Sequence, residues 1–212
     1  MKKTKVLVLG AGGAIAQHVI ELLENDKNIE LTLFARDVSR LNEYKSFANI
    51  IGGDVLDKND LQQAMQGQHI VYANLSGQVD KMAKVIVTSM EANKVNRLIF
   101  VTALGIYNEI PGKFGQWNEK MIGSDLVRYR HAADAIEASL LDYTIVRPAW
   151  LTDKNEIDFE LTHKGEPFKG TEVSRRSVGA FIADVLVHPE KEVRASIGID
   201  KPGTEGNKPA FY

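Results

Sequence analysis

A glycine-rich turn, placed between a short apolar run and a helical pattern, constrains the fold of this chain more than any other segment. The apolar residues 6–9 are typical of a central strand in a parallel sheet, which is covered on both faces. Gly10, Gly12 and Gly13 follow at once, and they permit a ligand to approach the backbone. From Ile15 onward apolar residues recur at helical spacing. The first N–H groups of that helix would face the turn, which suits a pyrophosphate.

The spacing of the small residues favours one frame for this turn. Gly10-x-x-Gly13-x-x-Ala16 places alanine where the helix packs closely on the strand. The frame Gly10-x-Gly12-x-x-Ile15 would place a bulky side chain there. The strand–turn–helix–strand context favours a dinucleotide as the ligand of this turn. A purely structural turn and a turn that binds another phosphate ligand are the alternatives. The residues expected to hold the dinucleotide here are Gly10, Gly12, Gly13, Ala14 and Ile15.

Composition excludes several classes of protein. The 212 residues are 44% hydrophobic and 25% charged, which is typical of a globular protein with a sizeable core. A net charge of −2 gives no basic surface for nucleic acid or anionic lipid. The absence of cysteine excludes disulfides and thiol catalysis, and the five histidines lack metal-ligand spacing. Residues 1–4 lead directly into the first strand, without the apolar stretch of a signal peptide or membrane span, so we expect a cytoplasmic protein.

Strand and helix patterns alternate along the first two thirds of the chain. We expect further strands at 29–35, 48–52, 70–74, 97–102 and 143–147, and helices at 41–47, 57–65, 78–93 and 117–140. This alternation predicts an α/β fold: a doubly wound, Rossmann-like parallel sheet with helices on both faces. Ligands of such sheets bind at the carboxyl ends of the strands.

The pattern loosens after Pro148. A short strand is expected at 159–162, a helix capped by Ser174 or Ser177 and running to Val187, and a last strand at 196–199. No linker divides the chain. We therefore expect a single domain, 1–212, in which 149–212 forms mostly a small substrate lobe and a peripheral tail.

The end of the second expected strand distinguishes NADP from NAD. An acidic residue there binds the ribose 2′-hydroxyl, whereas an arginine suits a 2′-phosphate. Arg36 occupies the expected position, with Arg40 one helical turn further on. This favours NADP (NADPH). Asp37 keeps NAD possible, and Arg36 as a solvated surface residue is the competing interpretation.

Two further strand ends carry candidate cofactor residues. Asp54 and Val55 follow the third strand, where an adenine would lie, and Asp54 is suited either to the adenine amine or to capping a turn. Ala73 and Asn74 close the fourth strand, where small residues let a cofactor lie across the sheet edge or form a structural turn.

Several of these segments together carry a family resemblance. They are the glycine turn, 35–36, 53–55, the sequence Leu-Asp-Tyr-Thr-Ile-Val-Arg-Pro at 141–148, and 165–175. Through them the chain resembles the atypical short-chain dehydrogenase/reductases, specifically the NmrA-like NAD(P)H-binding group. The resemblance implies that Pro148 and the residues after it line the nicotinamide and substrate pocket. It also places Thr102 where relatives have a serine or threonine near the nicotinamide.

The chain departs from this family at the proton-transfer pair. Short-chain dehydrogenases use Tyr-x-x-x-Lys, in which the lysine lowers the tyrosine pKa and holds the ribose. Here Asp125 stands at the tyrosine position and Tyr129 at the lysine position. Tyr129 is a candidate contact to the nicotinamide ribose, or else a packed aromatic residue of a helix.

Two other residues are candidates for catalysis. His131 is the imidazole nearest to this region, although a lone helical histidine commonly lies on the surface. Tyr107 lies in a segment rich in glycine and aromatics, 105–117, whose position after a strand suits a pocket wall or a flexible lid.

These observations lead to one main hypothesis of function. It is an NADP(H)-binding oxidoreductase that passes hydride to or from a small carbonyl, quinone or flavin-like substrate. The alternative is a redox sensor that binds NAD(P) without turnover, and a third possibility is an isomerase or epimerase that retains its nicotinamide. The expected partner is a small-molecule substrate, without nucleic acid or membrane, in a monomer or homodimer.

Overall fold

A computed structural model describes residues 3–212 and has a mostly parallel sheet at its centre. The eight strands of this sheet follow the order β3-β2-β1-β4-β5-β6-β10-β8, and only β8 runs antiparallel to its neighbour. Chain order reverses direction between β1 and β4, which is the switch point at which doubly wound sheets bind ligands. The strands are β1 (Thr4–Leu9), β2 (Ile29–Ala35), β3 (Asn49–Gly52), β4 (Ile70–Ala73), β5 (Arg97–Val101), β6 (Asp142–Pro148), β8 (Glu160–His163) and β10 (Ala195–Asp200).

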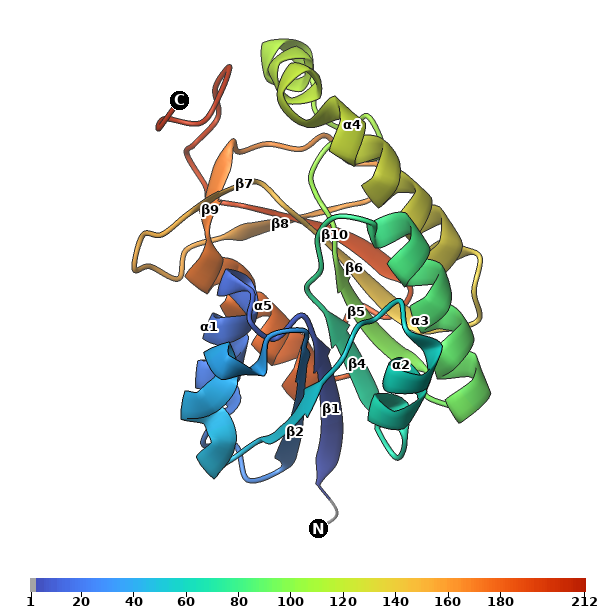
Figure 1. Ribbon diagram of the computed structural model, residues 1–212. Helices are drawn as coiled ribbons and strands as arrows, with labels where there is room; N and C mark the ends of the chain where they lie inside the picture. The colour runs from blue at the N-terminus through green and yellow to red at the C-terminus, as the bar shows by residue number, and fades with distance from the viewer. Residues whose placement is uncertain (1–2) are drawn as a thin grey trace.

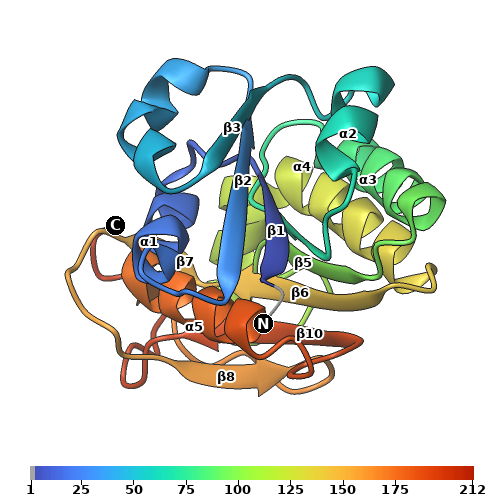
Figure 2. The same cartoon turned by 90° about the horizontal axis from the view of Figure 1, so that it is seen from below.

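Helices cover both faces of the sheet, as Figures 1 and 2 show. On one face α1 packs against α5, and on the other α3 packs between α2 and α4. The expected doubly wound α/β fold is therefore confirmed. The helices are α1 (Ala14–Leu23), α2 (Lys58–Met65), α3 (Val79–Asn93), α4 (Gly112–Glu137) and α5 (Arg175–Val187), with a 3-10 segment η1 (Val38–Ser46) after β2.

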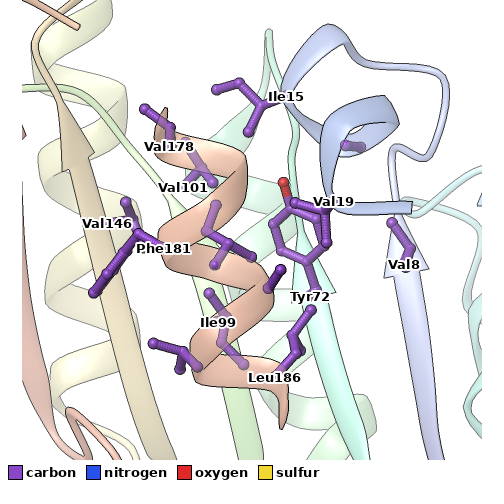
Figure 3. Packing of buried hydrophobic residues seen from close by; sticks show 14 of the residues in the cluster. Val8, Ile15, Val19, Tyr72, Ile99, Val101, Val146, Val178, Phe181 and Leu186 are labelled. Atoms are coloured by element: carbon purple, nitrogen blue, oxygen red, sulfur yellow. The ribbon is translucent and has the colours of Figure 1, made fainter. Parts of the chain in front are cut away.

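Each face of the sheet has its own apolar core. In the core beneath α1 and α5, Val8, Val19 and Phe181 are among the buried side chains (Figure 3). Tyr72 lies among them with a hydroxyl that has no hydrogen-bond partner within residues 3–212, and burial raises the pKa of that hydroxyl. The central strands β4 and β5 are buried on both faces, so they are nearly continuous apolar runs rather than alternating patterns.

Several expected boundaries are corrected by the structure. The helix expected at 41–47 is a 3-10 segment that begins at Val38, because Asp37 caps it by accepting hydrogen bonds from the Ser39 amide and hydroxyl. The helix expected from residue 117 begins at Gly112 and has a kink with non-helical angles at Ile122. Part of the expected 105–117 loop is therefore helical. Asp57 caps α2 as expected.

The chain after Pro148 forms more regular structure than its pattern indicated. Two short parallel strands, β7 (Trp150–Thr152) and β9 (Glu172–Ser174), form a second sheet that the sequence did not reveal, since three residues show no periodicity. Ser174 rather than Ser177 is the N-cap of α5 and accepts a hydrogen bond from the Ser177 amide.

The segment beyond β10 is anchored to this small sheet. The Thr171 hydroxyl donates to the Thr204 carbonyl at 2.6 Å, and the Ala210 amide donates to Glu172 Oε2 at 2.9 Å. Glu172 is buried and its second carboxylate oxygen accepts from Lys154. The tail is thus fixed at two points as far as Ala210.

A buried carboxylate at the end of β10 makes stability depend on pH. Asp200 is fully buried; burial raises the pKa of its carboxyl group from 3.8 to about 6, despite a hydrogen bond from the Gly170 amide. Glu160 and Glu205 raise this pKa further, and Lys169 lowers it. The native state therefore binds the proton more tightly than the unfolded state, so Asp200 lowers the unfolding free energy as pH rises from about 4 through 6.

Asp200→Asn is expected to remove this dependence while keeping an oxygen acceptor for Gly170. A rise of about two pKa units corresponds to about 3 kcal/mol. The stability of the variant relative to the wild type should increase by about 2–3 kcal/mol between pH 4 and pH 7.5. Urea unfolding at both pH values measures the change. A difference independent of pH would contradict the assignment.

Candidate functional site

A cavity of about 270 Å³ lies at the carboxyl ends of the strands, across the switch point. It extends from the end of β2, past the glycine turn after β1, to the segment after β4. Its lining residues are Gly10, Gly12, Gly13, Phe34, Ala35, Arg36, Asp37, Arg40, Gly53, Asp54, Val55, Asn74, Leu75, Ser76 and Met82.

The glycine turn is shaped by contacts that a side chain would prevent. Gly10 has a φ of +80°, and a Cβ at this position would lie 2.2 Å from the backbone oxygen of Asn74. A Cβ on Gly13 would lie 2.3 Å from Asn74 Nδ2. Gly12 differs, because a Cβ there would meet only the Arg40 side chain, at 3.8 Å. Gly10 and Gly13 are thus required by packing, and Gly12 keeps the cavity floor open.

The start of α1 lies beside this cavity, although Ala14 and Ile15, expected to bind the dinucleotide, are not among its lining residues. Gly13 is the N-cap and has no side chain to cap the helix, and the first turn carries no acidic residue. The amides of Ala14 and Ile15 belong to this uncapped first turn, while the Ile15 side chain lies in the core (Figure 3). Free amides and the positive end of the helix dipole together suit a phosphate group.

Two arginines lie at the end of β2 beside an aspartate whose carboxylate already accepts hydrogen bonds from Ser39. Asp37 accepts hydrogen bonds from the Ser39 amide at 3.0 Å and from the Ser39 hydroxyl at 2.6 Å. These bonds, with a smaller contribution from Arg40, lower the pKa of the Asp37 carboxyl. Within residues 3–212, Arg36 and Arg40 form no ion pair or hydrogen bond. This edge of the cavity therefore offers positive charge to a ligand, while one carboxylate oxygen of Asp37 is already engaged.

The residues after β3 and β4 complete the walls. Asp54 Oδ1 caps a turn by accepting from the Leu56 amide at 2.9 Å, and Val55 contributes an apolar surface. Asn74 lines the cavity, whereas Ala73 is buried in the core beneath α3 and lies outside the lining. Met82 of α3 also lines the cavity, although no sequence signal indicated it.

Three residues expected near the nicotinamide lie further along the same sheet edge. Thr102 follows β5, is buried, and donates its hydroxyl to the Val146 carbonyl at 3.1 Å. Pro148 ends β6 and its carbonyl accepts from the Leu104 amide. The Tyr129 hydroxyl donates to the carbonyl of Leu75, a residue of the cavity wall, at 3.3 Å. Burial raises the pKa of the Tyr129 hydroxyl.

The other two expected catalytic residues lie apart from this cavity. His131 is exposed on α4 and lines none of the cavities described here. Tyr107 lines a different cavity, and its hydroxyl donates to Glu137 Oε1 at 2.8 Å. Burial raises the pKa of Tyr107, and Lys164 Nζ lies 4.3 Å from its ring centroid. The structure therefore does not bring His131 or Tyr107 together with the glycine turn.

A buried ion pair holds the loop that follows β5. Arg147 of β6 is fully buried and pairs with Glu109, whose side chain is 5% exposed. The same carboxylate accepts hydrogen bonds from the Gly105 amide and the Tyr107 amide, each at 2.9 Å. One carboxylate thus fixes three groups at the edge of the sheet. This role was not predictable from sequence, since Glu109 stands in a loop of mixed composition.

Comparison with known proteins assigns the family. Residues 10–189 match the family described as NAD(P)H-binding. The chain belongs to this family. The expected resemblance to NAD(P)H-binding short-chain dehydrogenase/reductases and the expected class of cofactor are confirmed.

Relatives agree with this assignment. The chain is 51% identical to a Rossmann-fold NAD(P)-binding family protein from Shigella flexneri, over 99% of both chains, with a TM-score of 0.86. It is 29% identical to a Veillonella parvula short-chain dehydrogenase/reductase in complex with NADP, over 98% of this chain and 99% of that one, with a TM-score of 0.92. A Bacillus subtilis protein described as an uncharacterized sugar epimerase is 27% identical over 90% of this chain and 92% of its own length.

Residues 3–212 contain neither a membrane-spanning helix nor a metal-binding cluster. No helix there is long and apolar enough to cross a membrane. No group of three or more histidine, aspartate or glutamate side chains is arranged to hold a metal ion in that part of the chain.

Proposed function

We propose that this protein is an NADP(H)-dependent oxidoreductase. The observation that carries the proposal is the pair Arg36 and Arg40 beside an Asp37 that is already hydrogen-bonded to Ser39. Two guanidinium groups suit a 2′-phosphate, and the carboxylate that would otherwise favour the 2′-hydroxyl of NAD caps η1. The NADP complex of the Veillonella relative supports the same choice.

We assign the parts of such a dinucleotide to this cavity and to the sheet edge beside it. The amides at the start of α1 and the open floor at Gly12 accommodate the pyrophosphate. We assign the adenine to the wall formed by Asp54 and Val55. Asn74 lines the cavity beside the glycine turn, between this wall and the nicotinamide end. Thr102, Tyr129 and Pro148 lie outside the cavity lining, and we assign the nicotinamide end to the edge beyond it, where the Tyr129 hydroxyl, bonded to the Leu75 carbonyl, is the candidate contact to a ribose.

The chemistry follows from what this end of the site contains. When bound, NADPH supplies a hydride, and an acceptor that takes it up also needs a proton. Asp125 and Tyr129 occupy the positions of the usual tyrosine and lysine, so the protein lacks that proton-transfer pair. We therefore assign the protein the tasks of binding, orienting and excluding water, with the proton taken from solvent or the substrate itself. Such a site suits carbonyl, quinone or flavin-like acceptors in the 149–212 substrate lobe.

Arg36→Ala and Arg40→Ala test this proposal by affinity. Each variant should weaken NADPH binding about 10-fold or more, because an arginine–phosphate contact is lost. NADH binding should change less than about 3-fold, since NADH lacks the 2′-phosphate. Titration with both nucleotides measures the ratio, and Arg128→Ala, an exposed arginine of α4, is the control. Equal losses for NADPH and NADH would contradict the assignment.

A second candidate function is a sensor that binds NADP without turnover. The missing Tyr-x-x-x-Lys pair favours it. A sensor requires different affinities for NADP⁺ and NADPH. Steady oxidation of NADPH by a quinone or flavin acceptor, dependent on the protein, would favour the oxidoreductase. Failure of every acceptor, together with a large difference between the two affinities, would favour the sensor.

A further inference from the structure

An aromatic cluster lies at the same end of the molecule as the cofactor cavity. Trp150 follows β6, and Trp117 lies in the first half of α4, before the kink at Ile122. Figure 1 shows the start of α4, β7 and the C-terminal segment together at the end of the sheet where the glycine turn also lies. β6 is three strands from β1, or ~14 Å at about 4.8 Å per strand. This places the cluster on the nicotinamide side of the cavity.

The two tryptophans are held in fixed positions. Their ring centroids are 4.8 Å apart, and Phe114 stacks on Trp117 from the other side at 6.1 Å. The Trp150 indole N–H donates to Asn118 Oδ1 at 2.9 Å, and Asn118 is 1% exposed. Gly105 leaves room for Asn118, because a Cβ there would lie 2.8 Å from Asn118 Nδ2. These contacts hold the pair in place through the protein alone.

Tyr212 covers this pair. Its ring centroid lies 5.1 Å from that of Trp117 and 5.2 Å from that of Trp150, and both contacts are edge-on. Tyr212 is nevertheless 49% exposed. The Ala210 amide on Glu172 fixes the tail two residues before this ring, and the Tyr212 amide donates to the Pro209 carbonyl at 3.2 Å, which closes a turn within the tail. Within residues 3–212, Tyr212 meets the two tryptophans through ring contacts without a hydrogen bond, so displacing the ring breaks only those contacts.

We propose that Trp117 and Trp150 form the binding site for the planar aromatic ring of the acceptor, and that Tyr212 is a displaceable lid on that site. This proposal rests on the proposed oxidoreductase function, and it names the substrate class. Rigid indoles give a planar ring a large contact surface at low entropic cost. The Tyr212 ring competes for the same surface, so ligand binding requires its displacement.

The chain provides a direct signal for this test, because it contains only these two tryptophans. Intrinsic tryptophan fluorescence therefore reports on this site alone. Riboflavin and menadione, a flavin and a quinone, are the probes, titrated in the absence of nucleotide. Quenching should saturate in the wild type. Tyr212→Ala should bind about 5-fold tighter or more, because two aromatic contacts no longer compete.

Two further variants separate the lid from a structural role. Tyr212→Phe keeps the ring and should bind the probes as the wild type does. Trp150→Leu should lose saturable binding, followed through Trp117, while NADPH affinity stays within about 3-fold. Unfolding temperatures show whether each variant is folded.

Two results would overturn the proposal. Weaker or equal probe binding by a folded Tyr212→Ala would make Tyr212 a wall of the site or a bystander. No saturable quenching by either probe in any variant would remove the site itself. Probe binding is measured without nucleotide, and the cofactor proposal is tested by NADPH affinity. A failure of the acceptor site is therefore distinguishable from a failure of the proposed cofactor function.

Discussion

Glu109→Gln is expected to lower the free energy of unfolding by about 3 kcal/mol. Arg147 is fully buried, and the Glu109 carboxylate is its ion-pair partner. Breaking one side of a buried pair leaves an uncompensated charge in the interior, which costs about 3–5 kcal/mol. Glutamine keeps the shape and an oxygen for the Gly105 amide, but its NH2 group replaces the oxygen that accepts from the Tyr107 amide, so the loss combines the charge with that hydrogen bond. Urea unfolding at neutral pH measures it.

The matched control is Glu119→Gln, an exposed carboxylate on α4. Surface substitutions of this kind change stability by less than about 0.5 kcal/mol. A loss below about 1 kcal/mol for Glu109→Gln would mean that the Arg147 guanidinium is satisfied by its other bonds, to Ser196 and the Thr162 carbonyl.

Gly10→Ala is expected to be the most damaging change in the glycine turn. Its Cβ would lie 2.2 Å from a backbone oxygen, and the φ of +80° is unfavourable for alanine. Because Asn74 directly follows β4 and its amide donates to the Leu9 carbonyl at 2.9 Å, neither partner can move easily. We expect a loss of about 3 kcal/mol or more, from the clash together with the strain of a left-handed backbone. Thermal and urea unfolding measure this loss.

Gly12→Ala is the companion variant two positions away. A Cβ there meets only the flexible Arg40 side chain at 3.8 Å, so stability should change by less than about 1 kcal/mol. The methyl group would nevertheless enter the cavity floor, and NADPH affinity should fall about 10-fold or more. Similar stability losses in Gly10→Ala and Gly12→Ala would contradict this division between a packing glycine and a ligand-facing glycine.

The first half of the fold was predictable because its signals are local. Buried parallel strands are continuous apolar runs, and Asp57 marks the start of α2 by its own side chain. The glycine spacing identified the turn, and the structure explains the preferred frame: Gly10 and Gly13 are packed against Asn74, while Gly12 is not.

The parts that escaped prediction depend on contacts distant in sequence. β7 and β9 are three residues each and exist only because they pair. Glu109 meets Arg147 across 38 positions, and Tyr212 meets Trp117 across 95 positions. Tyr107 was expected near the chemistry because its loop follows a strand, but its ring lies against Lys164 and Glu137 instead. The local sequence contains no information on such partners.

Parallel calorimetric titrations of the unmodified protein with NADPH and NADH test the central claim most directly. Arg36 and Arg40 line the cavity without an ion-pair partner in the described part of the chain, residues 3–212, and Asp37 is bonded to Ser39. We expect NADPH to bind at least about 10-fold tighter than NADH, since charge-assisted contacts to a phosphate are strong. Equal affinities, or tighter binding of NADH, would contradict the claim that these two arginines select the 2′-phosphate.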